Sequence, residues 1–263
     1  GGVSTPAVTY PFTVITSLGT ASSTTATELQ GVNSHLTTNF VLGNDIDASD
    51  TRNWNGGDGF SPLGYLFNTY RGIFLGLGHT IRNLYINRPL TDHVGLFGIV
   101  ERGSTITTLG LVDATVTGAS HVGAMAGVNS GTILNSFATG EVHGQTNVGG
   151  LVGTLGTSAF DGFVRNSYAK TNVNLYGTRD AGGLIGLMES GTVYKSYANG
   201  RVIALDNTAV GVGGLIGRLG TSGANPTDVS LAGFWDTTLS GQSTSAAGIG
   251  LATAATQQIG RAS

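Results

Sequence analysis

The chain has 263 residues, of which 44 are glycine, 35 are threonine and only two are lysine, with a net charge of −3 and 10% charged residues. No basic stripe exists to hold a phosphate backbone, so we expect no nucleic-acid binding. Cysteine is absent and no apolar run approaches the roughly 18 residues of a membrane span, so we expect neither disulfides nor membrane insertion.

Residues 1–38 are predicted to be an entry segment. A β-like run, YPFTVI at 10–15, is followed by residues 26–36, where Leu29, Val32 and Leu36 recur at helical spacing. This spacing predicts a short amphipathic helix, which could lie across the first coil as a cap. From residue 39 onward the pattern becomes strand, turn, strand, with short alternating runs joined by a glycine bend at 76–78.

Two strings then recur along the chain. The glycine string reads NVGGLVG at 147–153 and returns as VGLFG, HVGAMAG, AGGLIG and VGGLIG, with last glycines at Gly98, Gly127, Gly153, Gly186 and Gly217. The second string reads GTILNSFATG at 131–140, FVRNSYAKT at 163–171 and GTVYKSYANG at 191–200. Intervals of 26 to 33 residues between the glycines are typical of a repeat protein with loops of variable length.

Equivalent positions are chemically alike from copy to copy, which favours stacked parallel coils over hairpins because stacking places like residues on like. We therefore predict an all-β parallel β-helix of roughly nine or ten coils, with 1–38 and 39–263 forming one elongated domain. The predicted columns are Leu96, Met125, Leu151, Leu184 and Leu215, which should be interior; Val94, Val122, Val148, Ala181 and Val212; Ser136, Ser167 and Ser196; and Phe137, Tyr168 and Tyr197.

Two local features break simple alternation. Lys195 takes the place that Asn135 and Asn166 hold in the other copies. In a straight strand it would share a face with the apolar residues two positions before and after it, which predicts a corner or bulge at that position. The glycine string is apolar on both faces, with Leu151 on one and Val148 on the other, which predicts that a loop or partner covers part of the outer wall.

These strings resemble the GLUG-type repeats of bacterial exoproteins in the filamentous haemagglutinin and high-molecular-weight adhesin class. The matching strings are GGLVG, GGLIG, NSFATG, NSYAKT and KSYANG, together with NFVLGNDIDAS, GIFLGLGHTIRNLYI and GFWDTTLSGQSTSAAGIGL, in order over most of residues 39–251. The resemblance implies a right-handed parallel β-helix shaft in a large secreted surface protein used in adhesion or biofilm matrix, without an active site. Leu75 departs from it, since such repeats often carry an aspartate there.

Several candidate chemistries have a structural alternative. Asp45, Asp47 and Asp50 could bind calcium, although short polar side chains commonly satisfy backbone groups at turns. Ser167 to Lys170 matches S-x-x-K but lies in a β repeat rather than at a helix start. Four histidines, His79, His93, His121 and His143, show no shared metal spacing.

Two sets of residues could act on or bind a polysaccharide. Asp161, Asp180, Asp206 and Asp228 lie in successive insertions and could line one edge of a glycan-active, pectin-lyase-like enzyme. The column of Phe137, Tyr168 and Tyr197 could bind sugar as a passive module, or could simply stack as part of a wall.

We expect a secreted adhesive shaft with no catalytic activity, cofactor or metal. Its expected partners are a cell-surface or matrix polysaccharide or a receptor on a host or neighbouring cell. The few large apolar residues after Trp235 predict an open C-terminal edge that associates end to end.

Overall fold

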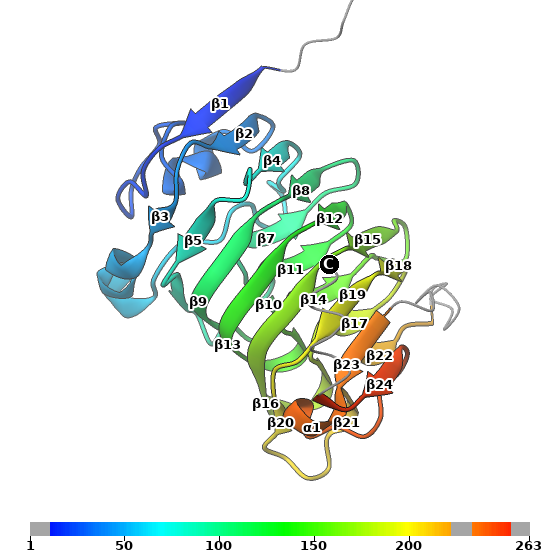
Figure 1. Ribbon diagram of the computed structural model, residues 1–263. Coiled ribbons are helices and arrows are strands. Elements are labelled where there is room, and N and C mark those ends of the chain that lie inside the picture. The colour runs from blue at the N-terminus through cyan, green and yellow to red at the C-terminus, as the bar shows by residue number, and fades with distance from the viewer. Residues whose placement is uncertain (1–10, 222–232, 254–263) are drawn as a thin grey trace, which may run out of the picture.

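The computed structural model describes residues 11–221 and 233–253, which form a parallel β-solenoid (Figure 1). Each turn passes through up to three walls, and each wall is a sheet built from strands of successive turns. Strands of neighbouring turns pair in parallel, so equivalent residues lie beside one another. The colour gradient in Figure 1 follows this stacking from β1 at one end to β24 at the other.

The seven-stranded wall contains β1 (Phe12–Ile15), β2 (Asn39–Leu42), β4 (Ile73–Leu75), β8 (Thr105–Thr107), β12 (Thr132–Leu134), β15 (Gly162–Arg165) and β18 (Gly191–Tyr194). The five-stranded wall contains β7 (Phe97–Val100), β11 (Ala126–Asn129), β14 (Val152–Leu155), β17 (Ile185–Met188) and β22 (Ile216–Leu219).

The twelve-stranded wall contains β3 (Ile46–Asp47), β5 (Thr80–Arg82), β6 (Tyr85–Asn87), β9 (Gly110–Thr117), β10 (Ser120–Gly123), β13 (Phe137–Gly149), β16 (Tyr168–Gly182), β19 (Ser196–Ala198), β20 (Val202–Ala204), β21 (Val210–Gly213), β23 (Gly233–Asp236) and β24 (Ile249–Leu251). Four short helices complete the described chain: η1 (Gln30–Ser34), η2 (Ser49–Asn53), η3 (Asn55–Gly57) and α1 (Thr237–Ser240).

The all-β parallel solenoid is as predicted, but its length is not. One strand per turn in the seven-stranded wall gives about seven turns, so nine or ten coils are not confirmed. β23 and β24 extend the twelve-stranded wall beyond β19. Part of the degenerate last copy, residues 229–232, and the tail after residue 253 lie outside the described residues. The right-handed sense of winding stays a prediction.

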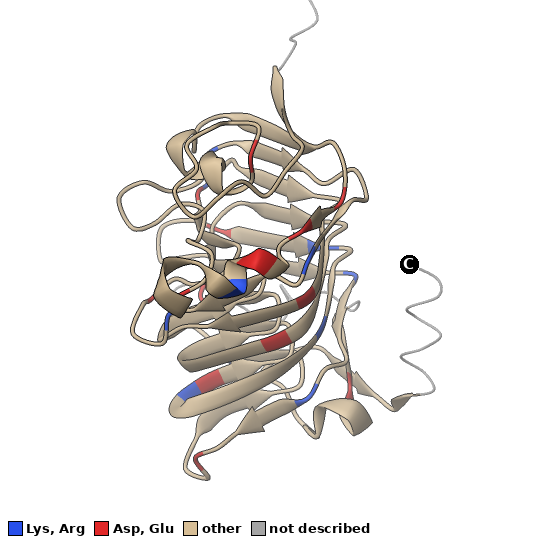
Figure 2. Cartoon of the chain, turned by 90° about the vertical axis from the view of Figure 1, so that its left-hand side faces the viewer, with Lys and Arg blue, Asp and Glu red and all other residues tan. Residues whose placement is uncertain are grey.

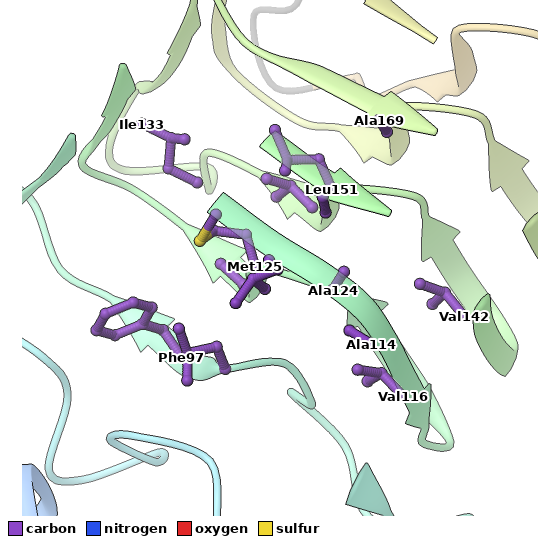
Figure 3. Close-up of a cluster of buried hydrophobic side chains, with 14 of the residues drawn as sticks. Phe97, Ala114, Val116, Ala124, Met125, Ile133, Val142, Leu151 and Ala169 are labelled. Carbon is purple, nitrogen blue, oxygen red and sulfur yellow. The ribbon is translucent and has the colours of Figure 1, made fainter. Parts of the chain in front are cut away.

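The predicted leucine column is interior. Leu96, Met125, Leu151, Leu184 and Leu215 are all 0% exposed. Their backbones also join successive turns, since the N–H of Met125 donates to the carbonyl of Leu151 at 3.0 Å. Figure 3 shows Met125 and Leu151 close together inside the solenoid. Superposed apolar side chains therefore form one core that runs from turn to turn.

The serine column is a buried hydrogen-bond ladder. The N–H of Ser136 donates to Oγ of Ser167 at 3.1 Å, and the N–H of Ser167 donates to Oγ of Ser196 at 3.2 Å. The preceding residue in these copies has a positive φ, 49° at Asn166 and 45° at Lys195. The corner predicted at Lys195 is therefore confirmed, and the serine hydroxyls satisfy amides there.

A bend divides the glycine string between two walls. β13 ends at Gly149 and β14 begins at Val152, and both Val148 and Val152 are 0% exposed. A Cβ added at Gly150 would overlap the carbonyl oxygen of Gly183 in the next turn. Glycine is needed here because two backbones approach closely. The bend lets residues on both sides of the string reach the core.

The entry segment is part of the solenoid, since β1 pairs with β2 across residue 38. The helix predicted at 26–36 is a five-residue 3-10 helix, η1, and the spaced residues Leu29, Val32 and Leu36 are buried. Its Gln30 side chain exchanges hydrogen bonds with the Ser61 backbone. η1 thus lies alongside the next turn as part of the side wall, which differs from the cap that was expected.

Candidate binding groove

A column of left-handed corner residues precedes the five-stranded wall. Asn, Asp and His adopt positive φ more readily than most other residues, and these types occupy the corner in four successive turns. The residues and their φ values are His93 (58°), His121 (55°), Asn147 (55°) and Asp180 (64°), and a glycine, Gly211 (70°), follows. Parallel pairing keeps them aligned, because the following residues Val122, Val148 and Ala181 are in register.

A groove lies beside this column on the five-stranded wall. Its floor crosses strands β7, β11, β14 and β17, which contribute Ile99, Val128, Thr154 and Leu187 in register. Leu66 and Phe160 come from loops and also line it. Val128 is 6% exposed and Leu187 is 4% exposed on this wall. The glycine-string residues from which outer cover was predicted, Val148 and Leu151, both belong to the core instead.

Two histidines stack within the groove. The rings of His93 and His121 are parallel within 1°, with centroids 4.8 Å apart. The amide Nδ2 of Asn147 lies 3.2 Å from Nδ1 of His121, and the Thr154 hydroxyl lies 2.7 Å from the same nitrogen.

Both histidines are neutral at pH 7. Burial is the main cause that lowers the pKa of His121 to about 4; the neighbouring His93 acts in the same direction and Asp92 opposes it. Burial also lowers the pKa of His93, against a smaller opposing effect of Asp92. The groove therefore gains no positive charge from its imidazoles at neutral pH.

Two carboxylates lie along the far side of the groove. Glu101 directly follows the last residue of β7, and Glu189 directly follows the last residue of β17. Ser130 directly follows the last residue of β11, so the three lie in one column. The hydroxyl of Thr69 donates to Oε2 of Glu101 at 2.9 Å, whereas Oε2 of Glu189 is buried without a hydrogen-bond partner among the described residues. Three steps of strand spacing place the two glutamates about 14 Å apart. This exceeds the roughly 5–10 Å of a glycosidase carboxylate pair.

The aspartates predicted to line one edge do not share a site. Asp180 is 1% exposed in the corner column, where Nε of Arg218 lies 2.9 Å from both of its oxygens. Asp161 accepts from the Ser190 hydroxyl, and Asp206 is partly exposed and accepts from Thr208. Asp228 lies outside the described residues. The three that are described therefore have separate structural partners.

The aromatic column is a stacked ladder whose ring faces cover one another. Phe137 and Tyr168 have centroids 5.0 Å apart and planes within 7°, and Tyr168 and Tyr197 are 4.9 Å apart and within 11°. The outer face of Phe137 lies over Gly110, where a side chain would collide with the ring. A sugar that stacks on an aromatic residue needs a free face, so this geometry favours the wall interpretation.

The acidic segment uses its carboxylates on the backbone. Asp45 accepts from the N–H of Thr80 at 2.8 Å, and Asp47 accepts from the N–H of Ser49 at 3.0 Å. Hydrogen bonds of this kind lower the pKa of Asp45, with the Thr80 amide as the largest cause. Asp50 lies in η2. Within residues 11–221 and 233–253, no group of three potential metal ligands gathers.

The S-x-x-K string does not form a catalytic pair. Ser167 is 1% exposed and its hydroxyl donates to the carbonyl of Arg165 at 2.7 Å. Lys170 extends over the ring of Tyr168, 5.3 Å from its centroid. Neither residue lies at a helix start, which that mechanism requires.

The sequence interpretation missed the histidine pair. His93 and His121 share no metal-ligand spacing in the sequence, yet each directly precedes the valine of a glycine string, and aligning VGLFG with HVGAMAG places them in one column. His79 and His143 have other partners, Asp45 and the hydroxyl of Tyr176. Repeat alignment extended by one residue would have predicted the stacking.

The fold and the groove define a parallel β-solenoid with an open groove on its five-stranded wall. Comparison with known proteins finds no matching family model. Over 138 residues the chain is 42% identical to halomucin of Haloquadratum walsbyi, a stretch covering 51% of this chain and 2% of halomucin. Over 116 residues it is 35% identical to a "putative Gly-rich membrane protein" of Evansella cellulosilytica, covering 42% of this chain and 13% of that protein.

A solved structure resembles the whole solenoid. A "putative immunoglobulin A1 protease" from Bacteroides ovatus superposes with a TM-score of 0.63 at 19% identity, over 94% of this chain and 86% of that one. At this identity the likeness is one of fold. None of the helices in the described residues is both long and apolar enough to span a membrane.

Proposed function

We propose that this chain is a segment of a larger secreted or cell-surface protein, in which the solenoid is a stiff shaft and its outer surface makes adhesive contacts. The observation that carries this is the uninterrupted core, in which each turn adds equivalent buried residues to the same columns. Such a stack gains length without changing its cross-section, because each turn contacts mainly its neighbours. Charged residues are few and spread along it (Figure 2).

The relatives support the location and the modular character. The chain matches 2% of one relative's length and 13% of the other's, as a unit within a much longer protein would. Their names, a mucin and a membrane protein, fit a cell-surface setting. We extend this to GLUG-type repeats, to polysaccharide or receptor partners on host or neighbouring cells, and to end-to-end association.

We further propose that the segment acts passively. The described aspartates have separate partners, and the groove glutamates are too far apart to act as an acid and base on one glycosidic bond. Purified protein incubated with uronic-acid and neutral polysaccharides, with and without calcium, should release no products. Turnover that is lost on Asp161→Asn or Asp180→Asn in a folded variant would establish the glycan-active alternative.

The surface location has a direct test. Antibodies raised against the purified segment should label intact cells of the source organism or their matrix, and external protease should remove the epitope. A cytoplasmic protein serves as the control that stays unlabelled and intact. Labelling that requires cell lysis would contradict the proposed function.

A further inference from the structure

We propose that the outer face of the seven-stranded wall pairs with the same face of a second copy of this chain, with the two solenoids side by side and pointing in the same direction. The proposal goes beyond a shaft with adhesive contacts, since it assigns one wall and one partner. Its evidence is the strand register, the side chains that point outward, the shapes of the two edges of the wall and the charges on those edges.

The seven-stranded wall is regular and carries no bulge over its last five strands. From β4 to β18 each strand pairs in parallel with the next without a register shift, whereas β13 in the twelve-stranded wall has shifts on both sides. Figure 1 shows β4, β8, β12, β15 and β18 side by side. Along each strand one buried residue lies between two that are more exposed, so the outward residues form two straight columns.

These two columns are almost without charge. The first consists of Ile73, Thr105, Thr132, Phe163 and Thr192. The second consists of Leu75, Thr107, Leu134, Arg165 and Tyr194. Apart from Arg165, every one of these residues is apolar, aromatic or threonine. Parallel sheets usually have both faces covered, and a contiguous apolar face of this kind is typical of an interaction surface.

The two columns match each other turn by turn, which points to a second copy. A two-fold axis parallel to the solenoid axis lays the first column of one copy over the second column of the other and keeps each turn opposite the same turn. Ile73 then meets Leu75 of the second copy. The threonines of β8 meet each other, and at two further turns threonine meets leucine or tyrosine. Arg165 meets Phe163 of the second copy, a kind of contact that it already makes with its own Phe163 at 5.1 Å.

The opposite direction fits less well. A two-fold axis parallel to the strands keeps each column on itself and reverses the order of the turns. Centred on β12, the middle of the five strands, this axis places Ile73 opposite a threonine and Phe163 opposite another. Arg165 then faces Thr107 of the second copy and has no aromatic ring there. The parallel arrangement therefore matches more of the face.

The two edges of the wall have complementary shapes. The chain enters the wall through connections of up to six residues, such as 156–161, and leaves it through one or two, such as Lys195 between β18 and β19. A hollow beside Thr132, bounded by Arg102 and Phe160, shows that the entry connections stand above the wall. In the parallel arrangement the raised edge of each copy lies over the low edge of the other, so the raised edges do not collide.

Opposite charges meet across these edges. Asp161 lies at the entry edge and accepts from the Ser190 hydroxyl, and Lys195 lies at the exit edge with Nζ 5.4 Å from the ring centroid of the outward Tyr194. Within the described residues neither forms an ion pair. Asp161 precedes β15 and Lys195 follows β18, which are neighbouring strands, so the parallel arrangement sets the two charges about 4.8 Å apart along the shaft. Symmetry supplies this pair twice.

The size of the face sets the strength of the pairing. Five strands and two columns give a footprint of about 25 by 12 Å, or roughly 300 Å² per copy, to which the edges add. Stable complexes bury about 800 Å² per partner, so one segment should dimerise weakly, with a dissociation constant of roughly 0.1–1 mM. In a longer shaft, further faces of the same kind would raise the effective concentration and strengthen the pairing.

The first test is chemical cross-linking, because the chain has no cysteine and introduced thiols report the geometry directly. Thr105→Cys and Thr107→Cys, one of them carrying a size tag, are mixed in equal amounts and treated with a short bismaleimide. The dimer that contains one of each variant should exceed either variant linked to itself. An excess of self-linked dimers would refute the parallel arrangement. Cross-linking no greater than that of Thr115→Cys, on the twelve-stranded wall, would refute the interface.

Sedimentation equilibrium at protein concentrations up to about 1 mM gives the affinity. Thr107→Lys places an ammonium group of each copy in the apolar face and should weaken dimerisation at least tenfold. Thr115→Lys is the matched control on the twelve-stranded wall and should leave the affinity unchanged. Lys195→Glu and Asp161→Lys should each weaken dimerisation severalfold, and the two together in one chain should restore it. All variants should melt within a degree or two of the parent, since they replace residues outside the core.

The proposal is overturned if the parent stays monomeric throughout, or if Thr107→Lys and Thr115→Lys dimerise equally. If Thr107→Lys instead abolishes adsorption to an insoluble polysaccharide while the parent stays monomeric, the face belongs to that ligand and the proposal is overturned as well. Surface labelling of cells with a strictly monomeric segment would leave the shaft in place and remove only this pairing. Dimerisation of a protein that is labelled only after lysis would remove the surface location and retain the pairing.

Discussion

Replacing Leu184 by aspartate tests whether the interior column holds the solenoid together. Leu184 is 0% exposed, and its backbone connects Leu151 in one turn with Leu215 in the next. Truncating a buried leucine costs about 2–5 kcal/mol through lost burial and the cavity left behind. An unpaired polar group in that space adds at least about 1–3 kcal/mol. We therefore expect Leu184→Asp to lower the free energy of unfolding by about 3–8 kcal/mol.

That loss is a large fraction of the roughly 5–15 kcal/mol that stabilises an ordinary domain. Urea unfolding followed by circular dichroism gives the midpoint and slope for parent and variant. Leu205→Asp is the control, since Leu205 is 63% exposed and its replacement should change stability by less than about 0.5 kcal/mol. If Leu184→Asp unfolds at the parental midpoint, the column is not the core and the stacking argument is refuted.

Three further predictions concern buried polar groups. Ser167→Ala removes the acceptor of the Ser136 amide and should lower the free energy of unfolding by about 1–3 kcal/mol in urea titration, while Thr192→Ala on the seven-stranded wall should change it little. Arg218→Gln leaves the Asp180 carboxylate buried without its cation and should lower the free energy of unfolding by about 2–3 kcal/mol. Adding Asp180→Asn to the same chain should restore part of this loss. Strictly additive effects of the two substitutions in this double-mutant cycle would contradict the pairing. The folded pKa of His121, about 4, lies below the unfolded value of 6.5, so the unfolded state binds more protons between these two pH values. The free energy of unfolding should therefore fall by about 2 kcal/mol as the pH drops from 6.5 to 4. His121→Asn should flatten this dependence on pH, and an unchanged slope would show that another group titrates.

The repeat itself could be predicted because it is local and copied. Leu151, Leu184 and Leu215 follow the same string in each copy, and a parallel coil can only place them one above another. The corner at Lys195 was also predictable, since a lysine between two apolar residues cannot share their face in a straight strand. Like residues at like positions were sufficient evidence for the stacked columns, and a break in the alternation was sufficient evidence for the corner.

The failures lie where neighbouring turns interact. The sequence pattern places Asp180 in an insertion at one edge, but it is the corner residue of its turn and is buried against Arg218. The pairing joins positions 38 residues apart, and no single copy of the repeat contains both. The protonation state of His121 likewise depends on burial and on His93 in the preceding turn.

The sequence by itself determined the class of fold, the parallel stacking, the interior columns and the corner at Lys195, because each follows from residue type and repeat register within one or two turns. Only the tertiary structure decided that there is a groove. Its floor comes from four strands and its rims from loops at Leu66 and Phe160, almost a hundred residues apart in the chain. The insertions have no repeated pattern, so their positions follow from packing against neighbouring turns, which the register of the strings does not specify.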